Sequence, residues 1–300
     1  MKQTTIAPVI IFAYNRLSPL KKMVESLQRN TESLLTDVFI FIDGPKKESD
    51  IFSVNEVKGY VKNIKGFKSL DISISSINKG LSKSIISGLN QVFQYYDNAI
   101  ILEDDLILST NFLSYMNTSL NKYRNFENVI SVSGYSNKIG SHENYDFDSY
   151  FITRNSSWGW ATWKDQWSKI DWELDDWEKV KSNSQDFNNY CGSDCFKMLE
   201  KWKNGLNQSW AIRFVYSQYL QKKLSVTPLK SKVINAGFGG DGTHCSGKSR
   251  FVSEFDNSNN KIFYFPERIF ISEQINKQAI KYHSLYYRIY MKIKNFSFEK

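Results

Sequence analysis

The sequence predicts an α/β fold with a mainly parallel central sheet and helices on both of its faces. Along the first half of the chain, short apolar runs alternate with segments whose apolar residues recur at helical spacing. The runs are continuous rather than alternating, which is typical of strands buried on both faces. A chain of 300 residues with 41% hydrophobic and 23% charged residues can form one such domain, or a main domain with a smaller annex.

The first strand and the first helix are predicted within residues 8–27. Residues 8–13 form an apolar, β-branched run and predict a buried strand. Ser18 followed by Pro19 matches a helix N-cap and the first helical position. The apolar residues that then recur at helical spacing are Leu20, Met23, Val24 and Leu27.

The same alternation continues to residue 132. Strands are predicted at residues 38–42, 72–74, 99–102 and 129–132, and helices at residues 54–64, 81–93 and 112–123. Turn residues close the second strand at 43–45 and the third at 78–80, and Thr110 is the predicted cap of the last helix. This strand–helix order implies a mainly parallel sheet.

Polar residues follow four of the predicted strands, at the point where each strand ends. Because the carboxyl ends of parallel strands meet at one edge of a sheet, where ligands bind, we expect these clusters to lie together. They are residues 14–16, 43–44, 78–80 and 103–105.

After about residue 133 the regular alternation is lost and the chain becomes rich in aromatic residues. All eight tryptophans lie between Trp158 and Trp210. Such rings either form a core layer or stack on sugar faces. Because no Pro/Ser-rich linker separates this part, we expect an elaboration of one domain. The predicted organisation is a domain over residues 1–250, with halves at 1–135 and 136–250, and an extension over residues 251–300.

Three consecutive carboxylates, Glu103, Asp104 and Asp105, come directly after a predicted buried strand. Their mutual repulsion would be relieved by a hard cation with oxygen ligands. Mn²⁺ or Mg²⁺ fits, since such sites use one or two carboxylates together with substrate phosphates. The alternative is a solvated acidic turn favoured by the dipole of the following helix.

The sequence lacks the motifs of several other classes of enzyme. There is no Walker-type loop, no Gly-x-Gly-x-x-Gly after a strand and no Gly-x-Ser-x-Gly elbow. Three cysteines, Cys191, Cys195 and Cys245, are too few for a disulfide framework, and free thiols are expected. A zinc site formed by these cysteines and His244 is a weaker alternative.

The net charge is +8, and its basic excess grows toward the end of the chain. Residues 281–294 mix aromatic, aliphatic and cationic side chains without an acidic one. This segment predicts either a peripheral contact with an anionic membrane or a helix packed on the domain with its cations in water. No nucleic-acid-binding module accompanies the charge, and no signal peptide or membrane-crossing run is present, so a cytoplasmic location is expected.

Several segments, in this order, resemble those of GT-A-fold glycosyltransferases. ILEDDL at residues 101–106, followed by Asn111 and Phe112, is similar to the metal-binding segment of N-acetylglucosaminyltransferase I and its bacterial relatives. VIIFAYNR at residues 9–16 and FIDG at residues 41–44 resemble the nucleotide-binding strand ends. WGWATW at 158–163, SWAIR at 209–213 and GDGTHC at 240–245 resemble segments of bacterial family-2-like polysaccharide glycosyltransferases.

The resemblance implies a GT-A, Rossmann-like fold with an aromatic-rich, acceptor-binding C-terminal elaboration. It implies that Asp105 binds the metal, with His244 as a second contact, and that Asp43 contacts the nucleobase. Trp158, Gly159 and Trp160 would form the acceptor platform. The remaining residues implied to bind the donor are Ala13, Tyr14, Arg16, Asn78, Gly80, Glu103 and Asp104.

The catalytic base departs from the pattern of the family. N-acetylglucosaminyltransferase I places an aspartate just before the Trp-Arg segment, where this chain has Asn207, Gln208 and Ser209. Inverting transfer needs a carboxylate that deprotonates the acceptor hydroxyl. Asp241 is the substitute candidate, and Asp194 and Asp176 are weaker ones.

The resulting prediction is a metal-dependent, inverting hexosyltransferase. It would move a sugar from a nucleotide donor, UDP-linked, to a glycan or lipid-linked oligosaccharide in bacterial surface polysaccharide synthesis. Two alternatives stay open. One is a nucleotidyltransferase that makes a nucleotide sugar, although the glycine-rich basic loop expected after its first strand is missing. The other is a carbohydrate-binding protein that has kept the fold without catalysis.

Overall fold

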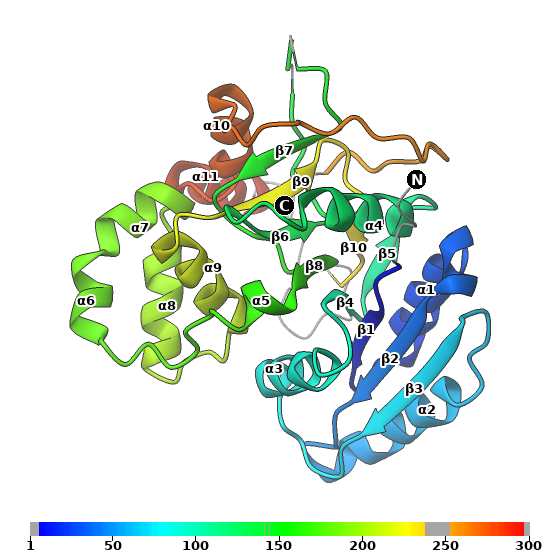
Figure 1. The fold of residues 1–300 in the computed structure, drawn as a ribbon. Helices are drawn as coiled ribbons and strands as arrows, with labels where there is room; N and C mark the ends of the chain where they lie inside the picture. The colour runs from blue at the N-terminus through cyan, green and yellow to red at the C-terminus, as the bar shows by residue number, and fades with distance from the viewer. Residues whose placement is uncertain (1–5, 141, 144, 238–252, 297–300) are drawn as a thin grey trace.

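In the computed structural model, residues 6–140, 142–143, 145–237 and 253–296 are described, and they form a mixed α/β structure around one large sheet (Figure 1). Its eight strands lie in the order β3-β2-β1-β4-β8-β6-β9-β7. Strands β1 to β4, β6 and β9 run in one direction, and β7 and β8 run in the other. The predicted fold class is therefore confirmed. The strands are β1 (Val9–Ala13), β2 (Asp37–Ile42), β3 (Ser69–Ile74), β4 (Asn98–Glu103), β6 (Val129–Ser133), β7 (Ser149–Ile152), β8 (Trp160–Trp163) and β9 (Leu224–Pro228).

Helices cover both faces of the parallel part of the sheet. Alternate residues of β1 point to opposite faces, so that Ile11 packs in one core and Phe12 in the other. The first core includes α1 (Leu17–Gln28), α2 (Ile51–Val61) and α4 (Phe112–Tyr123). The second includes α3 (Leu81–Val92), α5 (Lys164–Trp167) and α9 (Trp210–Leu220). Figure 1 shows α3 and α9 across the sheet from α1 and α2.

A smaller helical layer packs against α9. It contains α6 (Trp177–Ser182), α7 (Ser184–Cys191) and α8 (Cys195–Lys203), whose apolar residues form a separate buried cluster with α9. Cys191 and Cys195 are free thiols buried in this cluster. Two 3-10 turns, Thr31–Leu35 and Glu48–Asp50, complete the first half.

A second, two-stranded sheet lies directly after the acidic cluster. Strand β5 (Leu106–Leu108) pairs in antiparallel fashion with β10 (Val233–Asn235), although more than 120 residues separate them in sequence. The backbone N–H of Ala236 donates to the carbonyl of Asp105 at 2.8 Å. The chain after β10 therefore lies against the last carboxylate of the cluster.

Two predicted helix caps are wrong. Helix α1 begins at Leu17 with Arg16 at the N-cap position, so Pro19 lies within the first turn rather than at its first position. Proline is tolerated there because the N–H groups of the first turn have no partner within the helix. Helix α4 begins after Asn111, and the Thr110 hydroxyl bonds instead to the side chain of Asn259 at 2.7 Å.

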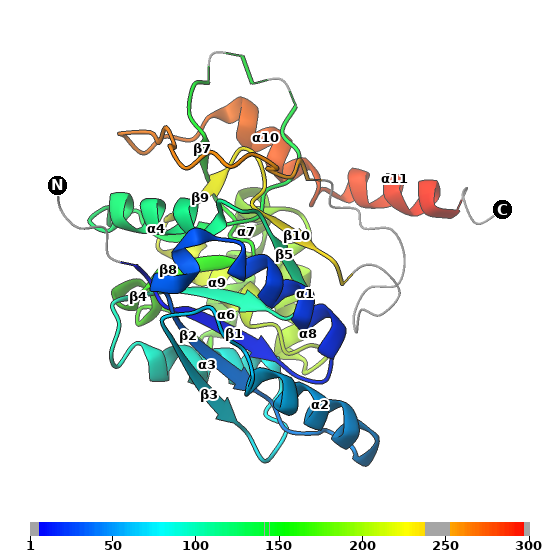
Figure 2. The same ribbon diagram turned by 90° about the vertical axis from the view of Figure 1, so that its right-hand side faces the viewer.

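The C-terminal part returns across the first half of the molecule. Residues 253–272, called the strap here, run along α4 and lead to α10 (Glu273–Lys281) and α11 (Leu285–Phe296) (Figures 1 and 2). Among the described parts of the chain, no helix is both long enough and apolar enough to cross a bilayer.

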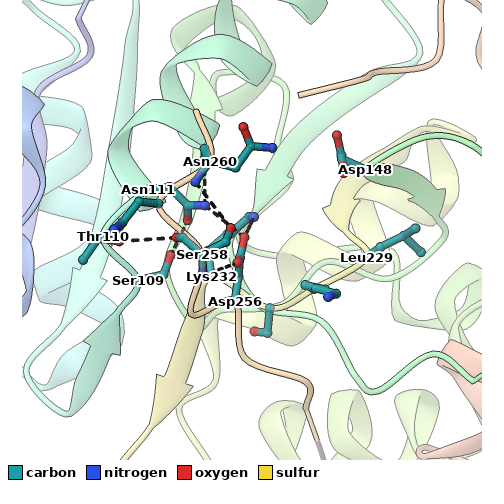
Figure 3. A network of polar contacts seen from close by, with 12 residues as sticks. Ser109, Thr110, Asn111, Asp148, Leu229, Lys232, Asp256, Ser258 and Asn260 are labelled. Atoms are coloured by element: carbon teal, nitrogen blue, oxygen red, sulfur yellow. Dashed lines mark hydrogen bonds and ion pairs between the residues drawn. The ribbon is translucent and has the colours of Figure 1, made fainter. Parts of the chain in front are cut away.

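A buried ion pair fastens the strap to α4 and β10 (Figure 3). Lys232 pairs with Asp256, and both side chains are almost fully buried. The Asn111 amide donates to Asp256 at 2.9 Å, and the backbone N–H of Ser258 does so at 2.8 Å. Burial opposes ionisation of Asp256, but the hydrogen bonds lower its pKa to about 2.

We expect Lys232→Met to lower the free energy of unfolding by about 3–5 kcal/mol, because it leaves a buried carboxylate without its cation. Urea unfolding followed by tryptophan fluorescence measures the change. The double variant Lys232→Met/Asp256→Leu removes both charges and should recover most of the loss. Equal destabilisation in the single and double variants would contradict this account of the pair.

The same carboxylate predicts a pH dependence. Since the pKa of Asp256 is lower in the folded protein than in the unfolded chain, its stabilising contribution is present above about pH 4 and is lost as the pH falls toward 2. The difference in unfolding free energy between the natural protein and Asp256→Asn should therefore shrink over that range. Acid titrations of both proteins at fixed ionic strength measure it, and a constant difference would disprove the prediction.

Candidate functional site

A cavity of about 360 Å³ lies beyond the carboxyl ends of β1, β2 and β4. The strand ends converge there as the parallel order predicts. Every donor- or metal-site residue predicted in the described part of the chain lines it: Ala13, Tyr14, Arg16, Asp43, Asn78, Gly80, Glu103, Asp104 and Asp105. The predicted roles of these residues remain predictions, but their convergence in one cavity is observed.

The acidic cluster carries more negative charge than its neighbours balance. The Arg16 guanidinium pairs with Asp104 and, at 3.1 Å, with Asp105. Burial, followed by repulsion from its two neighbours, raises the pKa of Glu103 to about 8. Burial also raises the pKa of Asp104 to about 6, against the opposing effect of Arg16. The cluster therefore favours additional positive charge.

The cluster fits a hard divalent cation by the chemistry of its donors. Among the described residues, no three His, Cys, Asp or Glu side chains are arranged as a ready metal cage. Mg²⁺ and Mn²⁺ do not need one, because they are bound through one or two carboxylates together with water and phosphate oxygens. Asp105, at the end of the cluster beside β10, and Asp104 are the residues that would hold such an ion.

Asp43 holds two loops together at the second strand end. One of its carboxylate oxygens accepts from the N–H groups of Gly44 at 2.9 Å and Lys79 at 2.8 Å, and the other accepts from Gly80 at 2.8 Å. The Asn78 amide donates to the Gly44 carbonyl at 2.8 Å. Asp43 therefore shapes the wall of the cavity, and its contact with a nucleobase stays a prediction.

Glycine is required at two positions of this wall. A Cβ atom at Gly44 would lie 2.5 Å from the backbone of Ile77. Gly80 has a φ of +76° and forms the N-cap of α3, where a Cβ atom would lie 2.9 Å from the Gln208 side chain. Gln208 belongs to the segment that carries the base aspartate in the resembled family, and its amide lies against this wall.

Tyr14 is tied to the edge of the cavity through its hydroxyl group. That group donates to Asp50 at 2.8 Å and accepts from the backbone N–H of Lys46 at 2.8 Å. Further lining residues were not expected from the sequence: Phe12, Phe41, Lys46, Leu81, Ser84, Asn235 and Gly237. No motif indicated Asn235 and Gly237. They reach the site because β10 pairs with β5, and this pairing of distant segments is not visible in the sequence.

Trp158 and Trp160 have different environments, although both were predicted to bind the acceptor. Trp158 is partly exposed and lines the cavity. Trp160 is fully buried and stacks on Trp210 at 4.8 Å, so it offers no face to a ligand. Gly159 between them has a φ of +61°, and its carbonyl accepts from Gly134 at 2.6 Å. Of the two tryptophans, Trp158 lines the cavity and Trp160 does not.

A second cavity, of about 270 Å³, shares Trp158 with the first. Side chains with hydroxyl or amide groups line part of it: Ser133, Tyr135, Ser136, Asn137, Tyr150, Asn155, Ser156, Ser157 and Thr227. Apolar side chains line much of the rest: Ile152, Met198, Ala211, Ile212 and Val215. Arg154 also lines it and pairs with Asp194 at 2.7 Å. Groups of this kind suit a polyhydroxylated ligand.

The three predicted base candidates have different outcomes. Asp241, like the predicted metal contact His244 and the third cysteine Cys245, lies outside the described residues. Asp194 is buried and ion-paired to Arg154, and Asp176 caps α6 through the N–H of Lys179. Neither Asp194 nor Asp176 lines the first cavity. Both side chains make contacts that stabilise the fold, and their role as a base stays a prediction.

No family model matches the chain, and no curated protein matches its sequence. Among solved structures, TarS of S. aureus is 11% identical, with a TM-score of 0.42 over 74% of this chain and 35% of that one. The mannosyltransferase PcManGT from Pyrobaculum calidifontis, in complex with GDP-Man and Mn²⁺, is 9% identical, with a TM-score of 0.41 over 73% of this chain and 70% of that one. The chain spans about a third of the length of TarS. Structural similarity at this level does not show the function, which has to be argued from the site.

We expect Gly237→Ala to weaken the binding of Mn²⁺ by about tenfold, since displacing a group beside a metal ligand commonly has an effect of this size. A Cβ atom at position 237 would lie 2.4 Å from a carboxylate oxygen of Asp105, so that carboxylate must move. Titration of free Mn²⁺ by electron paramagnetic resonance measures the affinity. Gly59→Ala is the matched control, because a Cβ atom there meets nothing within 4 Å. Equal affinities in the two variants would contradict the assignment of Asp105.

Proposed function

We propose that this protein is a glycosyltransferase of the GT-A type that transfers a sugar from a nucleoside diphosphate donor. The observation that carries the proposal is the under-neutralised cluster of Glu103, Asp104 and Asp105 in a cavity at the joint end of three parallel strands. Carboxylates of this kind are expected where a divalent cation bridges protein and phosphate. The adjoining cavity, which combines hydroxyl and amide groups with apolar side chains, supports a second substrate such as a sugar, which has polar edges and apolar faces.

The remaining walls of the first cavity favour an anionic ligand. Helices α1 and α3 begin at its edge, after Arg16 and Gly80, and helix N-termini attract phosphates. Lys46 lines the same cavity. Phe12 and Phe41, which stack at 5.4 Å, give it an aromatic floor. Phosphate binding is therefore supported on one side and packing of a base or sugar on the other.

In the proposed reaction, Asp105 and Asp104 would hold Mn²⁺ or Mg²⁺. The ion would supply neutralisation of the charge that develops on the departing diphosphate. Arg16 lines the same cavity and would add a second positive charge beside the diphosphate. Trp158 would separate donor from acceptor, because it lines both cavities.

The finer parts of the proposal follow from the sequence. We propose a UDP-linked donor, a glycan or lipid-linked acceptor and a role in bacterial surface polysaccharide synthesis, with Asp241 as the base of an inverting transfer. The segment Asn207, Gln208 and Ser209 favours one alternative, since it has no carboxylate where the resembled family has its base. In that case the protein would bind donor and glycan without turnover.

We expect a nucleoside diphosphate, UDP first, to raise the melting temperature by roughly 5–10 °C at about 100 times its dissociation constant, and only with Mn²⁺ present. Asp105→Ala should abolish this shift, because the metal would lose its main ligand. Asp97→Ala is the matched control, since Asp97 is an exposed aspartate at the other end of β4.

Thermal unfolding of the three proteins against UDP, GDP, ADP and CDP, with and without Mn²⁺, measures the effect. A shift that is independent of metal, or that survives in Asp105→Ala, would contradict the assigned site. No shift with any nucleotide would end the glycosyltransferase proposal. Binding of donor without release of nucleotide, in the presence of acceptor, would identify the non-catalytic alternative.

A further inference from the structure

Helix α11 presents an apolar stripe to solvent. Figure 2 shows the helix extending away from the rest of the molecule. Large apolar side chains with 47–80% of their surface exposed follow one another along it: Leu285, Tyr286, Ile289, Tyr290 and Ile293. Because successive helical residues are rotated by about 100°, these five lie within an arc of roughly 140°. The stripe is therefore continuous along the helix.

The first turn of α11 is tied to the end of α10. Tyr287 and Met291 are only partly exposed, and the ring of Tyr287 packs edge-on against that of Tyr282 at 4.9 Å. Tyr282 is itself buried and donates to the carbonyl of Lys138 at 3.0 Å. The helix is thus attached at its beginning, and its apolar stripe is exposed rather than packed in the core.

The sequence that carries the stripe is cationic. Between Gln274 and Phe296 the sequence contains no aspartate or glutamate, and its basic residues are Lys277, Lys281, Arg288, Lys292 and Lys294. An apolar face that carries tyrosines within a cationic segment is suited to the interface of a bilayer, where aromatic rings lie at the level of the headgroups and cations attract anionic lipids. A second copy of the chain fits less well, since pairing the same face would bring two cationic segments together.

We propose that α11 docks on an anionic lipid surface, with its apolar stripe inserted among the headgroups. The helix begins two residues after His283, which lines the second cavity. The carbonyl of His283 accepts from the Ser193 hydroxyl at 3.2 Å, which ties this junction to the loop before α8. Docking would therefore hold the second cavity close to the membrane. The docking does not depend on the proposed function. Only the further step, in which the membrane supplies a lipid-linked acceptor to that cavity, rests on it.

Sedimentation of the full chain with vesicles tests the docking. We expect binding to vesicles of phosphatidylglycerol and phosphatidylcholine, at least about tenfold weaker binding to pure phosphatidylcholine, and weaker binding at high salt. Tyr286→Asp should lower the partition onto anionic vesicles by about tenfold, because it places a negative charge in the inserted face. Tyr95→Asp is the matched control, since Tyr95 is 78% exposed and Tyr286 is 80% exposed.

Three results would overturn the proposal. They are no binding of the natural protein to anionic vesicles, equal binding of the two variants, and a lipid-free dimer that Tyr286→Asp dissociates in analytical ultracentrifugation. The metal-dependent thermal shift by nucleotide should be the same in both tyrosine variants. If the natural protein shows the thermal shift but does not bind vesicles, the docking proposal is wrong and the donor site stands. If it binds vesicles but shows no thermal shift, the donor-site proposal is wrong and the docking stands.

Discussion

The crowding of three carboxylates at the buried end of β4 constrains the rest of the site. Burial and mutual repulsion raise the pKa values of Glu103 and Asp104, and Arg16 offsets only part of the charge. The constraint also explains why α1 begins without a side-chain cap. Arg16 occupies the N-cap position, where its guanidinium group pairs with the cluster and, as a donor only, cannot accept from the first N–H groups of the helix. The start of α1 thus lacks the stabilisation of a side-chain cap, and the residue at that position instead neutralises part of the charge at the end of the sheet.

The parallel half of the fold could be predicted because its information is local. Continuous apolar runs and helical spacing located β1 to β4 and α1 to α4, and parallel order placed their polar ends together. The position of β8 between β4 and β6 could not be predicted, because it depends on pairing between distant segments. The same holds for β10, whose pairing with β5 brings Gly237 against Asp105.

The aromatic segment shows where pattern alone is insufficient. In an extended strand, residues 158 and 160 would share one face, and both rings would be offered to the same ligand. The positive φ of Gly159 breaks that alternation. Trp158 consequently lines the two cavities, whereas Trp160 packs in the core against Trp210. The backbone angle at Gly159 thus decides that Trp158 is a candidate ligand contact and Trp160 a core residue. The spacing of the two tryptophans in the sequence does not reveal this angle.

The wall that carries Trp158 is fixed by backbone rather than by flexible side chains. The N–H of Gly134 donates to the Gly159 carbonyl at 2.6 Å, and a Cβ atom at Gly134 would lie 2.7 Å from that oxygen. The ring of Tyr135 packs edge-on against Trp158 at 4.5 Å. Two ligands in the adjoining cavities would therefore meet at a separation that the backbone sets. In the proposed transfer, such fixed placement would reduce the orientational freedom that the two bound substrates lose on the way to reaction.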